Sequence, residues 1–453
     1  MGGLFGTSGV RGVVGEQITP QLAIGLGLTL ATHLKNSGAV VVGKDPRTSS
    51  DMLESCLISG ILSGGCDVKR LGIVPTPAVS FAARKLKAKA GIMITASHNP
   101  PEYNGIKFFD SSGMAYTPIM EGKIERIYFG KKWKKAAWDK IGNVEELDVL
   151  QSYVEALAGT VQISRDYKVV VDCGNGAASV VAPLLLGEVG CRVTSLNSQP
   201  DGFFPGRPLE PSPENLVELC KVVKSTGADL GIAHDGDADR VVIVDNTGLV
   251  VPGDEILALI AARQVMGSRG TVVTTVDASK VVDEVVGERG AKVVRTRVGD
   301  VSVAAEIKRR KAVFGGEPCG AWIFPGFSMA PDGLLGALKV LELMSSSGEA
   351  ISKLLAPLPD YYMVREKVAC PDERKDKAMK TILKKLEGEF KESIGALKVD
   401  GVRVNLEDGW ALVRASGTEP YIRVTAEART PGRADEIVKK AAKVLKRAIK
   451  SSR

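Results

Sequence analysis

The stretch Ala90-Gly-Ile-Met-Ile94-Thr-Ala-Ser97-His98-Asn99-Pro100-Pro101 joins a short apolar run to a polar loop. The apolar run is typical of a buried strand, so the serine, histidine and asparagine are expected just after the end of that strand. Loops in this position commonly carry functional side chains, and the two prolines stiffen the chain that leaves the loop. We therefore predict that Ser97 carries a phosphoryl group. A plain surface turn is the alternative, because serine, asparagine and proline are also common turn residues.

This arrangement of apolar runs and a polar loop occurs three times along the chain. Each copy has three strand-like runs, then a polar loop and a further strand that forms a hairpin. The runs are residues 39–43, 66–71 and 91–95, then 168–172, 191–195 and 229–233, and finally 270–274, 291–295 and 311–314. Strands that alternate with helical stretches indicate βαβ units on a largely parallel sheet. Because ligands lie beyond the carboxyl ends of such strands, the three polar loops are expected to face one cleft.

The last part of the chain predicts a different, fourth domain. After a proline-bearing linker at 356–359, the expected elements are strands at 361–370, 402–404, 410–413 and 421–425 and helices at 372–390 and after Thr430-Pro431. We expect four domains, at residues 1–150, 151–252, 253–359 and 360–453. The predicted fold class is α/β, with three similar α/β domains on mixed sheets and a C-terminal α+β domain around a central cleft.

Composition excludes several classes of protein. The seven cysteines are scattered without a C-x-x-C pair, which argues against a disulfide framework or zinc site and favours the cytoplasm. No apolar run is long enough to span a bilayer, and the first residues lack the pattern of a signal peptide, so no membrane partner is expected. The net charge of +7 is a mild excess that suits an acidic small molecule. The basic stretch 439–453 has an apolar helical face, so we expect no nucleic-acid partner.

The second polar loop, His234-Asp235-Gly-Asp237-Ala-Asp239-Arg240, has three carboxylates at alternate positions. On a short turn they can converge on one hard cation. An EF-hand is excluded, because Arg240 stands where that loop needs glycine and Asn246 where it needs glutamate. Mg²⁺ is the expected metal, since it combines few carboxylates with phosphoryl oxygens. A solvated acidic turn is the alternative.

Other loops offer groups for an anion or a sugar. The loop from Arg414 to Pro420, with Arg423 beyond it, combines guanidinium groups, hydroxyls and backbone amides, a set that suits a phosphate dianion. Glu317 lies on a glycine-flanked loop and could accept hydrogen bonds from sugar hydroxyls, although an exposed loop acid is the plain alternative. The opening loop contains Arg11 among glycines and hydroxyl residues and could face an anion.

Taken together, these loops resemble those of the α-D-phosphohexomutases. The segments T-A-S-H-N-P, D-G-D-x-D-R, G-G-E and R-x-S-G-T-E-P occur in the order of that family, and the resemblance covers nearly the whole chain. It implies four domains around a central cleft, the first three alike. It also implies that Ser97 is a phosphoserine, and that Asp235, Asp237 and Asp239 bind Mg²⁺ together with its phosphate.

The resemblance assigns substrate contacts as well. It implies that Glu317 holds sugar hydroxyls, with Arg240 and Cys319 as further substrate-binding candidates. The nonreacting phosphate would be held by Arg414, Ser416, Gly417, Thr418 and Arg423.

Phosphoryl transfer through Ser97 would also need a general base and positive charge. Arg11 and Lys107 are candidates for stabilising the moving group. Lys107 is also a candidate general base if cationic neighbours lower its pKa, and His98 is the alternative base.

The choice of sugar rests on the whole pattern, which looks most like that of archaeal phosphoglucosamine mutases. The segment Val298-Gly-Asp300 resembles that of phosphoglucosamine mutases and some archaeal hexomutases, whereas Cys319 and Ala321 replace the usual serine and histidine of the sugar loop. We expect a mutase that interconverts the 6- and 1-phosphates of a hexose, with glucosamine phosphate preferred and glucose or mannose phosphate as alternatives. A phosphoserine-dependent phosphatase, a noncatalytic sugar-phosphate binder and a homo-oligomer are left open.

Overall fold

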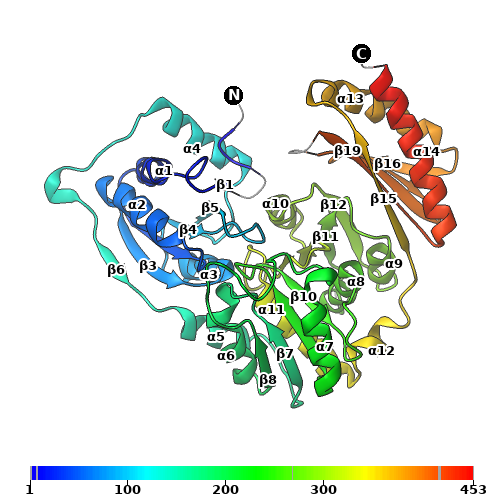
Figure 1. Ribbon diagram of the computed structural model, residues 1–453, viewed down its shortest axis with the longest axis horizontal. Coiled ribbons are helices and arrows are strands. Elements are labelled where there is room, and N and C mark those ends of the chain that lie inside the picture. The colour runs from blue at the N-terminus through cyan, green and yellow to red at the C-terminus, as the bar shows by residue number, and fades with distance from the viewer. Residues whose placement is uncertain (1–2, 7–8, 268, 417–419, 452–453) are drawn as a thin grey trace.

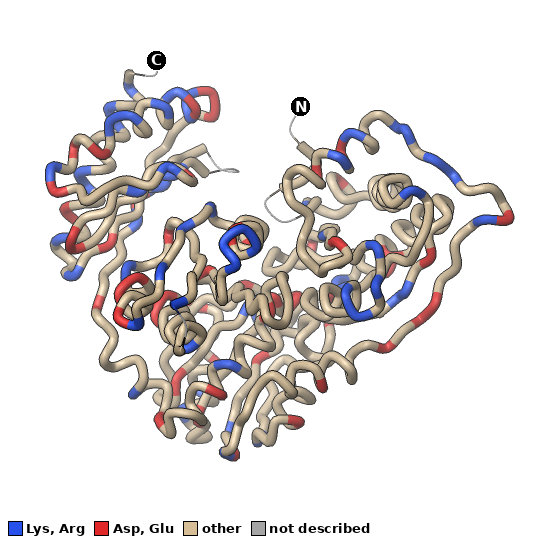
Figure 2. Tube along the Cα trace, turned by 180° about the vertical axis from the view of Figure 1, so that it is seen from behind, with Lys and Arg blue, Asp and Glu red and all other residues tan. Residues whose placement is uncertain are grey.

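The computed structural model describes residues 3–6, 9–267, 269–416 and 420–451 of the chain. Figure 1 shows the four domains in an arc, with the N-terminal and C-terminal domains at its two ends. Lysine and arginine are interspersed with aspartate and glutamate on all four domains (Figure 2). Among the described residues, no helix is both long and apolar enough to cross a membrane.

The first domain is a mixed sheet of six strands with helices packed on it. The strands are β1 (Val10–Val13), β2 (Ala39–Lys44), β3 (Asp67–Ile73), β4 (Ala90–Ile94), β5 (Tyr103–Asp110) and β6 (Val144–Glu146), in the order β1-β5-β4-β2-β3-β6. The helices are α1 (Pro20–His33), α2 (Ser50–Ser63), α3 (Thr76–Lys85) and α4 (Pro118–Gly130). Strand β5 runs antiparallel to both of its neighbours, while β2, β3, β4 and β6 are parallel.

The second and third domains each have a four-stranded sheet. The second contains α5 (Leu150–Ala158), β7 (Lys168–Asp172), α6 (Ala182–Glu188), β8 (Arg192–Leu196), α7 (Val217–Thr226), β9 (Leu230–His234) and β10 (Val241–Val244). The third contains α8 (Gly253–Gln264), β11 (Thr271–Thr275), α9 (Val281–Gly287), β12 (Lys292–Thr296), α10 (Asp300–Arg310), β13 (Phe314–Gly316), β14 (Trp322–Ile323), α11 (Gly333–Ser347) and α12 (Ile351–Leu355).

The three sheets share one strand order, which confirms the repeat predicted from the sequence. The orders are β3-β2-β4-β5, β8-β7-β9-β10 and β12-β11-β13-β14. In each, the first three strands are parallel and the fourth is antiparallel. The polar loop of each copy connects the third strand to the fourth, so it leaves the carboxyl edge of its sheet. The repeat therefore delivers three loops from equivalent positions.

Local sequence explains the first helix and its packing. The Thr19 hydroxyl accepts a hydrogen bond of 3.2 Å from Leu22 N, and Pro20 begins α1 as an N-cap pattern predicts. Helices α1 and α2 cross at two glycines. A β-carbon on Gly27 would lie 2.2 Å from the Leu57 carbonyl oxygen, so only glycine permits this approach.

One apolar core runs through the first three domains. It includes Phe81 of the first domain, Tyr153 and Val169 of the second, and Trp322 of the third, all buried. Such a close-packed core resists small displacements, so the loops are held in fixed positions relative to one another.

The fourth domain has an antiparallel sheet in the order β15-β19-β18-β17-β16. Its elements are β15 (Tyr362–Ala369), α13 (Asp372–Glu389), β16 (Ser393–Leu397), β17 (Val402–Leu406), β18 (Gly409–Ala415), β19 (Tyr421–Ala428) and α14 (Pro431–Lys450). Alternate residues of β18 face opposite ways. Ala411 and Val413 pack with the two helices, whereas Trp410 and Leu412 form a small core with Val276 of the third domain. The predicted α+β domain is confirmed, but β16 was not predicted.

Candidate active site

Ser97 lies where the first and second domains meet. Its backbone has a φ of 52°, in the left-handed region that costs a non-glycine residue about 1–3 kcal/mol. Only 2% of the residue is exposed, and its Oγ donates a hydrogen bond of 2.6 Å to Asp235 Oδ2. Burial against a carboxylate of another domain excludes a plain surface turn.

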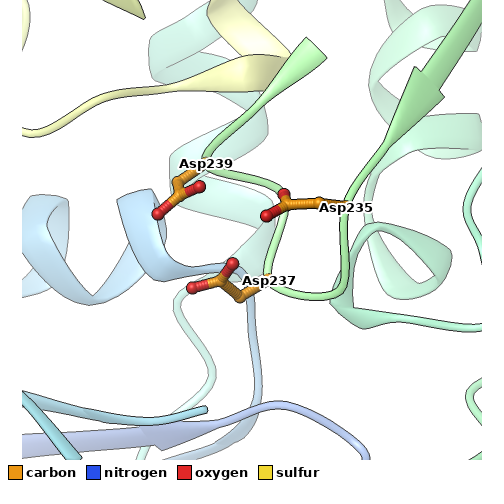
Figure 3. Close-up of side chains that lie close together, drawn as sticks. All are labelled: Asp235, Asp237 and Asp239. Atoms are coloured by element: carbon orange, nitrogen blue, oxygen red, sulfur yellow. The ribbon is translucent and has the colours of Figure 1, made fainter. Parts of the chain in front are cut away.

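The three aspartates of the second loop converge, as Figure 3 shows. One carboxylate oxygen from each of Asp235, Asp237 and Asp239 lies within 4.8 Å of the others, and all three residues are buried. A solvated acidic turn is therefore excluded. The Oδ1 atom of Asp237 is buried without a hydrogen-bond partner in the described part of the chain. Hard oxygen donors with an unused acceptor fit a divalent cation.

Two residues of the first domain reach this acidic group. Lys107 on β5 donates through Nζ to Asp237 Oδ2 at 2.7 Å and to Asp239 Oδ2 at 2.8 Å. Thr76, at the start of α3, donates its backbone N–H to the Asp237 carbonyl oxygen at 2.9 Å and its hydroxyl to Oδ2. Our sequence reasoning missed Thr76; its only signal is the Pro75-Thr76-Pro77 helix start after β3.

Burial and neighbouring charges together shift the pKa values of these groups. Burial, and then the charges of Asp239 and Asp237, raise the pKa of Asp235 well above its ordinary range. Burial also opposes ionisation of Asp237, but the Lys107 ammonium outweighs it and lowers the pKa of that carboxyl. Burial likewise disfavours the Lys107 cation, but Asp237 and Asp239 outweigh it and raise its pKa. We expected Lys107 to act as a general base only if its pKa were lowered, and the raised pKa contradicts that condition.

His98 has a different electrostatic setting beside the serine. Burial, followed by the positive charges of Arg240 and Arg11, lowers the pKa of His98 to about 3. Its ring is therefore neutral near pH 7, with Nδ1 3.4 Å from Ser97 Oγ. On its other side, Nε2 lies 3.7 Å from Glu210 Oε2.

Two arginines lie beside the Ser97 loop and the aspartate loop. Arg11 comes from β1, where it pairs with Gly105 of β5, and its guanidinium donates to Asn99 Oδ1 at 2.7 Å. Arg240 ends the aspartate loop, with Nε 3.9 Å from Asp235 Oδ2 and one terminal nitrogen 3.3 Å from Glu210 Oε2. Glu210 was also missed, because a lone glutamate between prolines offers no signal in the sequence.

The third loop presents a buried carboxyl group. Glu317 is 7% exposed and accepts a hydrogen bond of 2.9 Å from Gly299 N, so it is not an exposed loop acid. Burial, and then the charge of Asp300, raise the pKa of Glu317 to about 8. Burial raises the pKa of the nearby Cys319 thiol to about 12. Asp300 begins α10, and burial raises the pKa of its carboxyl group although the positive charge of Lys107 opposes this.

The candidate phosphate-binding residues lie on the fourth domain, apart from Ser97 and the three aspartates. Arg414 and Arg423 are directly opposite on the paired strands β18 and β19. Arg414 forms an ion pair of 2.7 Å with Asp400, and Ser416 N donates to the Tyr421 carbonyl oxygen at 3.1 Å. Gly417 and Thr418 lie outside the described residues. In Figure 1, this strand pair belongs to the domain at the opposite end of the arc from the first domain.

The fold and the order of the loops define an α-D-phosphohexomutase. Four models of the phosphoglucomutase/phosphomannomutase family match the chain: alpha/beta/alpha domain I at residues 2–135, domain II at 151–248, domain III at 252–362 and the C-terminal domain at 366–444. The chain belongs to this family and is an intramolecular phosphotransferase.

Individual relatives agree with this placement over nearly their full length. A probable phosphoglucosamine mutase of Methanothermobacter thermautotrophicus is 54% identical over 432 residues, covering 95% of each chain. Another from Pyrococcus abyssi is 48% identical over 453 residues, covering 100% of each. A crystal structure of a phosphoglucomutase/phosphomannomutase family protein from Burkholderia thailandensis superposes with a TM-score of 0.89 at 28% identity, covering 98% of this chain and 96% of that one.

Proposed function

We propose that this protein interconverts glucosamine 6-phosphate and glucosamine 1-phosphate through a phosphoserine at residue 97 and a bisphosphate intermediate. The observation that carries the proposal is the hydrogen bond of 2.6 Å between Ser97 Oγ and Asp235 Oδ2, beside two further buried carboxylates. The choice of sugar is supported by the printed names of archaeal relatives that are 46–54% identical to this chain. Glucose and mannose phosphates are the competing substrates.

The aspartate group would hold Mg²⁺ together with the phosphate on Ser97. The bound cation would neutralise charge on the transferring group. Lys107 and Arg11 add positive charge on the side of the first domain, where they stabilise the same group. The neutral ring of His98 lies within reach of the serine oxygen and is free to accept a proton, whereas Lys107 is held as a cation.

The reaction then needs two transfers in opposite directions. A sugar hydroxyl attacks the phosphorus atom, its proton passes to the base, and the bond to Ser97 Oγ breaks. The resulting bisphosphate reorients in the site, and Ser97 Oγ attacks its other phosphorus atom. The bond between that phosphorus and the sugar oxygen breaks, the base returns its proton to this oxygen, and the phosphoserine is restored as the sugar leaves with its remaining phosphate.

Residues of the other domains would recognise the sugar and its nonreacting phosphate. Glu317, Cys319 and Arg240 would contact the sugar, and the nonreacting phosphate would be held by Arg414, Ser416, Gly417, Thr418 and Arg423. A positively charged 2-amino group beside Glu317 would favour the ionised form of its carboxyl group, which burial alone disfavours.

We further propose domain boundaries at 1–150, 151–252, 253–359 and 360–453, a hexose phosphate as the partner molecule, and the cytoplasm as compartment. No nucleic-acid or membrane partner is required by this function, and a homo-oligomer is compatible with it.

A comparison of glucosamine, glucose and mannose phosphates at equal concentration tests the proposal. We expect the glucosamine compound to give the highest kcat/KM in the presence of Mg²⁺, and mass spectrometry to find phosphate on Ser97. Faster turnover of glucose 1-phosphate would overturn the choice of sugar. Active protein without phosphate on Ser97 would overturn the mechanism.

A further inference from the structure

A buried arginine, Arg47, donates hydrogen bonds to the backbone of the Ser97 loop. One terminal nitrogen of Arg47 donates to the carbonyl oxygens of Ser97 and Asn99, at 2.9 and 2.8 Å. The other donates to the carbonyl oxygens of Pro100 and Tyr103, at 2.6 and 2.9 Å. The residue is 2% exposed.

The carboxylate that orients Arg47 is also tied to Ser97. Asp45, directly after β2, accepts from Arg47 Nε at 2.9 Å and from the Thr95 hydroxyl at 2.7 Å. That hydroxyl oxygen in turn accepts from Ser97 N at 2.8 Å. The carbonyl oxygen of Ser97 is thus held directly by Arg47, and its amide is held by Asp45 through the Thr95 hydroxyl.

The second domain has a corresponding Asp–Arg pair at the equivalent strand. Asp172 ends β7, the counterpart of β2, and accepts from Arg207 Nε at 2.9 Å. A terminal nitrogen of Arg207 donates at 2.7 Å to the carbonyl oxygen of His234, the residue before Asp235. Arg207 is 7% exposed. One pair therefore holds the serine loop and the other holds the aspartate loop.

The two pairs are also joined across the domain boundary. The ring of Phe204, three residues before Arg207, lies under the Arg47 guanidinium, with 5.2 Å between the guanidinium carbon and the ring centroid. The loops themselves touch, because a β-carbon on Gly236 would lie 2.5 Å from the Ser97 carbonyl oxygen. A small shift of either loop would therefore change the distance from Ser97 Oγ to Asp235.

We propose that the pairs Asp45–Arg47 and Asp172–Arg207 are positioning devices for phosphoryl transfer, the first setting the serine and the second setting the metal loop. We place neither arginine among the substrate contacts, because their donors end on backbone carbonyl oxygens and on the carboxylate of the paired aspartate. The inference rests on the proposed roles of Ser97 and the aspartates. Lysine cannot replace arginine here, since an ammonium lacks the planar fork that spans several acceptors.

Conservative Arg47→Lys and Arg207→Lys variants of the full chain test this inference. Arg47→Lys should lower kcat about 100-fold, the cost of misplacing a reacting group by about 1 Å, with KM and the Kd for Mg²⁺ within about twofold. Arg207→Lys should raise the Kd for Mg²⁺ roughly tenfold, measured by calorimetry on dephosphorylated protein.

Arg192→Lys is the matched control, because Arg192 also pairs with an aspartate, Asp166 at 2.9 Å, but on the surface. It should change neither quantity. The inference is overturned if Arg47→Lys keeps more than half of the wild-type kcat, or if its loss of kcat equals its loss of folded protein as measured by circular dichroism.

A second variant covers the case in which Arg47→Lys does not fold. Thr95→Val preserves shape but removes the hydroxyl that joins Asp45 to Ser97 N, and it should lower kcat about tenfold at unchanged KM. An unchanged kcat overturns the inference. If the wild type turns over no hexose phosphate, the proposed function fails, while the Mg²⁺ measurement on Arg207→Lys still decides the role of the second pair.

Discussion

Ser97 and Asp235 are 138 positions apart, yet the Ser97 hydroxyl donates to the Asp235 carboxylate at 2.6 Å. The serine follows the third strand of the first domain and the aspartate follows the third strand of the second. The bond therefore joins equivalent loops of two repeats. It places a nucleophilic oxygen at the edge of a group of carboxylates that fits a metal ion.

Replacing Ser97 by alanine should abolish turnover while the protein stays folded. The change removes the atom that would carry the phosphoryl group, so we expect kcat to fall by more than ~1,000-fold, as when a catalytic nucleophile is lost. Steady-state kinetics and thermal melting measure the two effects. Ser55→Ala, an exposed serine on α2, is the control. Substantial activity in Ser97→Ala would remove Ser97 from the mechanism.

Asp237→Asn should weaken Mg²⁺ binding and slow phosphoryl transfer, with a smaller effect on KM. Loss of one anionic ligand reduces the attraction for a hard cation, so the Mg²⁺ concentration for half-maximal activity should rise roughly tenfold or more. A Mg²⁺ titration of activity measures this, with the exposed Asp139→Asn as control. An unchanged titration curve would argue against metal at this site.

Arg423→Ala should raise KM for every phosphosugar by a similar factor. A guanidinium contact to the shared phosphate does not distinguish sugars, and a hydrogen bond to a charged group is worth ~1.5–3 kcal/mol, about tenfold or more. Kinetics on glucosamine, glucose and mannose phosphates provide the comparison. A loss confined to one sugar would place Arg423 elsewhere.

Ala321→His should shift the ratio of kcat/KM toward glucose or mannose phosphate by ~1 kcal/mol, the scale of one polar contact. A histidine there would add a polar group, and when protonated it would repel a 2-ammonium group. Ala321 is only 6% exposed, so the larger ring should also cost about 1–3 kcal/mol of stability. Competition between two substrates gives the ratio directly. An unaltered ratio in folded protein would separate this position from sugar choice.

The stabilisation that Glu317 provides should depend on pH. Burial, and then Asp300, raise its pKa from an ordinary 4.5 to about 8, so between these values the folded state binds a proton that the unfolded state releases. Its contribution should be present below pH 4.5 and lost as pH rises toward 8. The melting temperature of the wild type relative to Glu317→Gln should therefore fall over this range. A constant difference would contradict the raised pKa.

Local patterns in the sequence determined the repeat and its loops. Apolar runs such as Val40 to Val42 become buried strands, and a polar loop after a third strand has only one edge of the sheet from which to leave. Short strands without an apolar face escaped prediction. Every residue of β6 is exposed, so the segment Val144–Glu146 needs no alternation of apolar and polar residues that would reveal a strand.

Only the tertiary structure decided which of these side chains meet. Lys107 contacts Asp237 across 130 positions, and this pairing, which no local pattern encodes, reversed the expected direction of its pKa shift. The buried Arg403 of the fourth domain donates to the carbonyl oxygens of Val276 and Ala278 in the third, both at 2.7 Å. Sequence patterns report the periodicity of one segment at a time, whereas desolvation and charge depend on every segment packed around a group. Residue types and loop order therefore came from the sequence, and protonation, positioning and the contacts between domains came from packing.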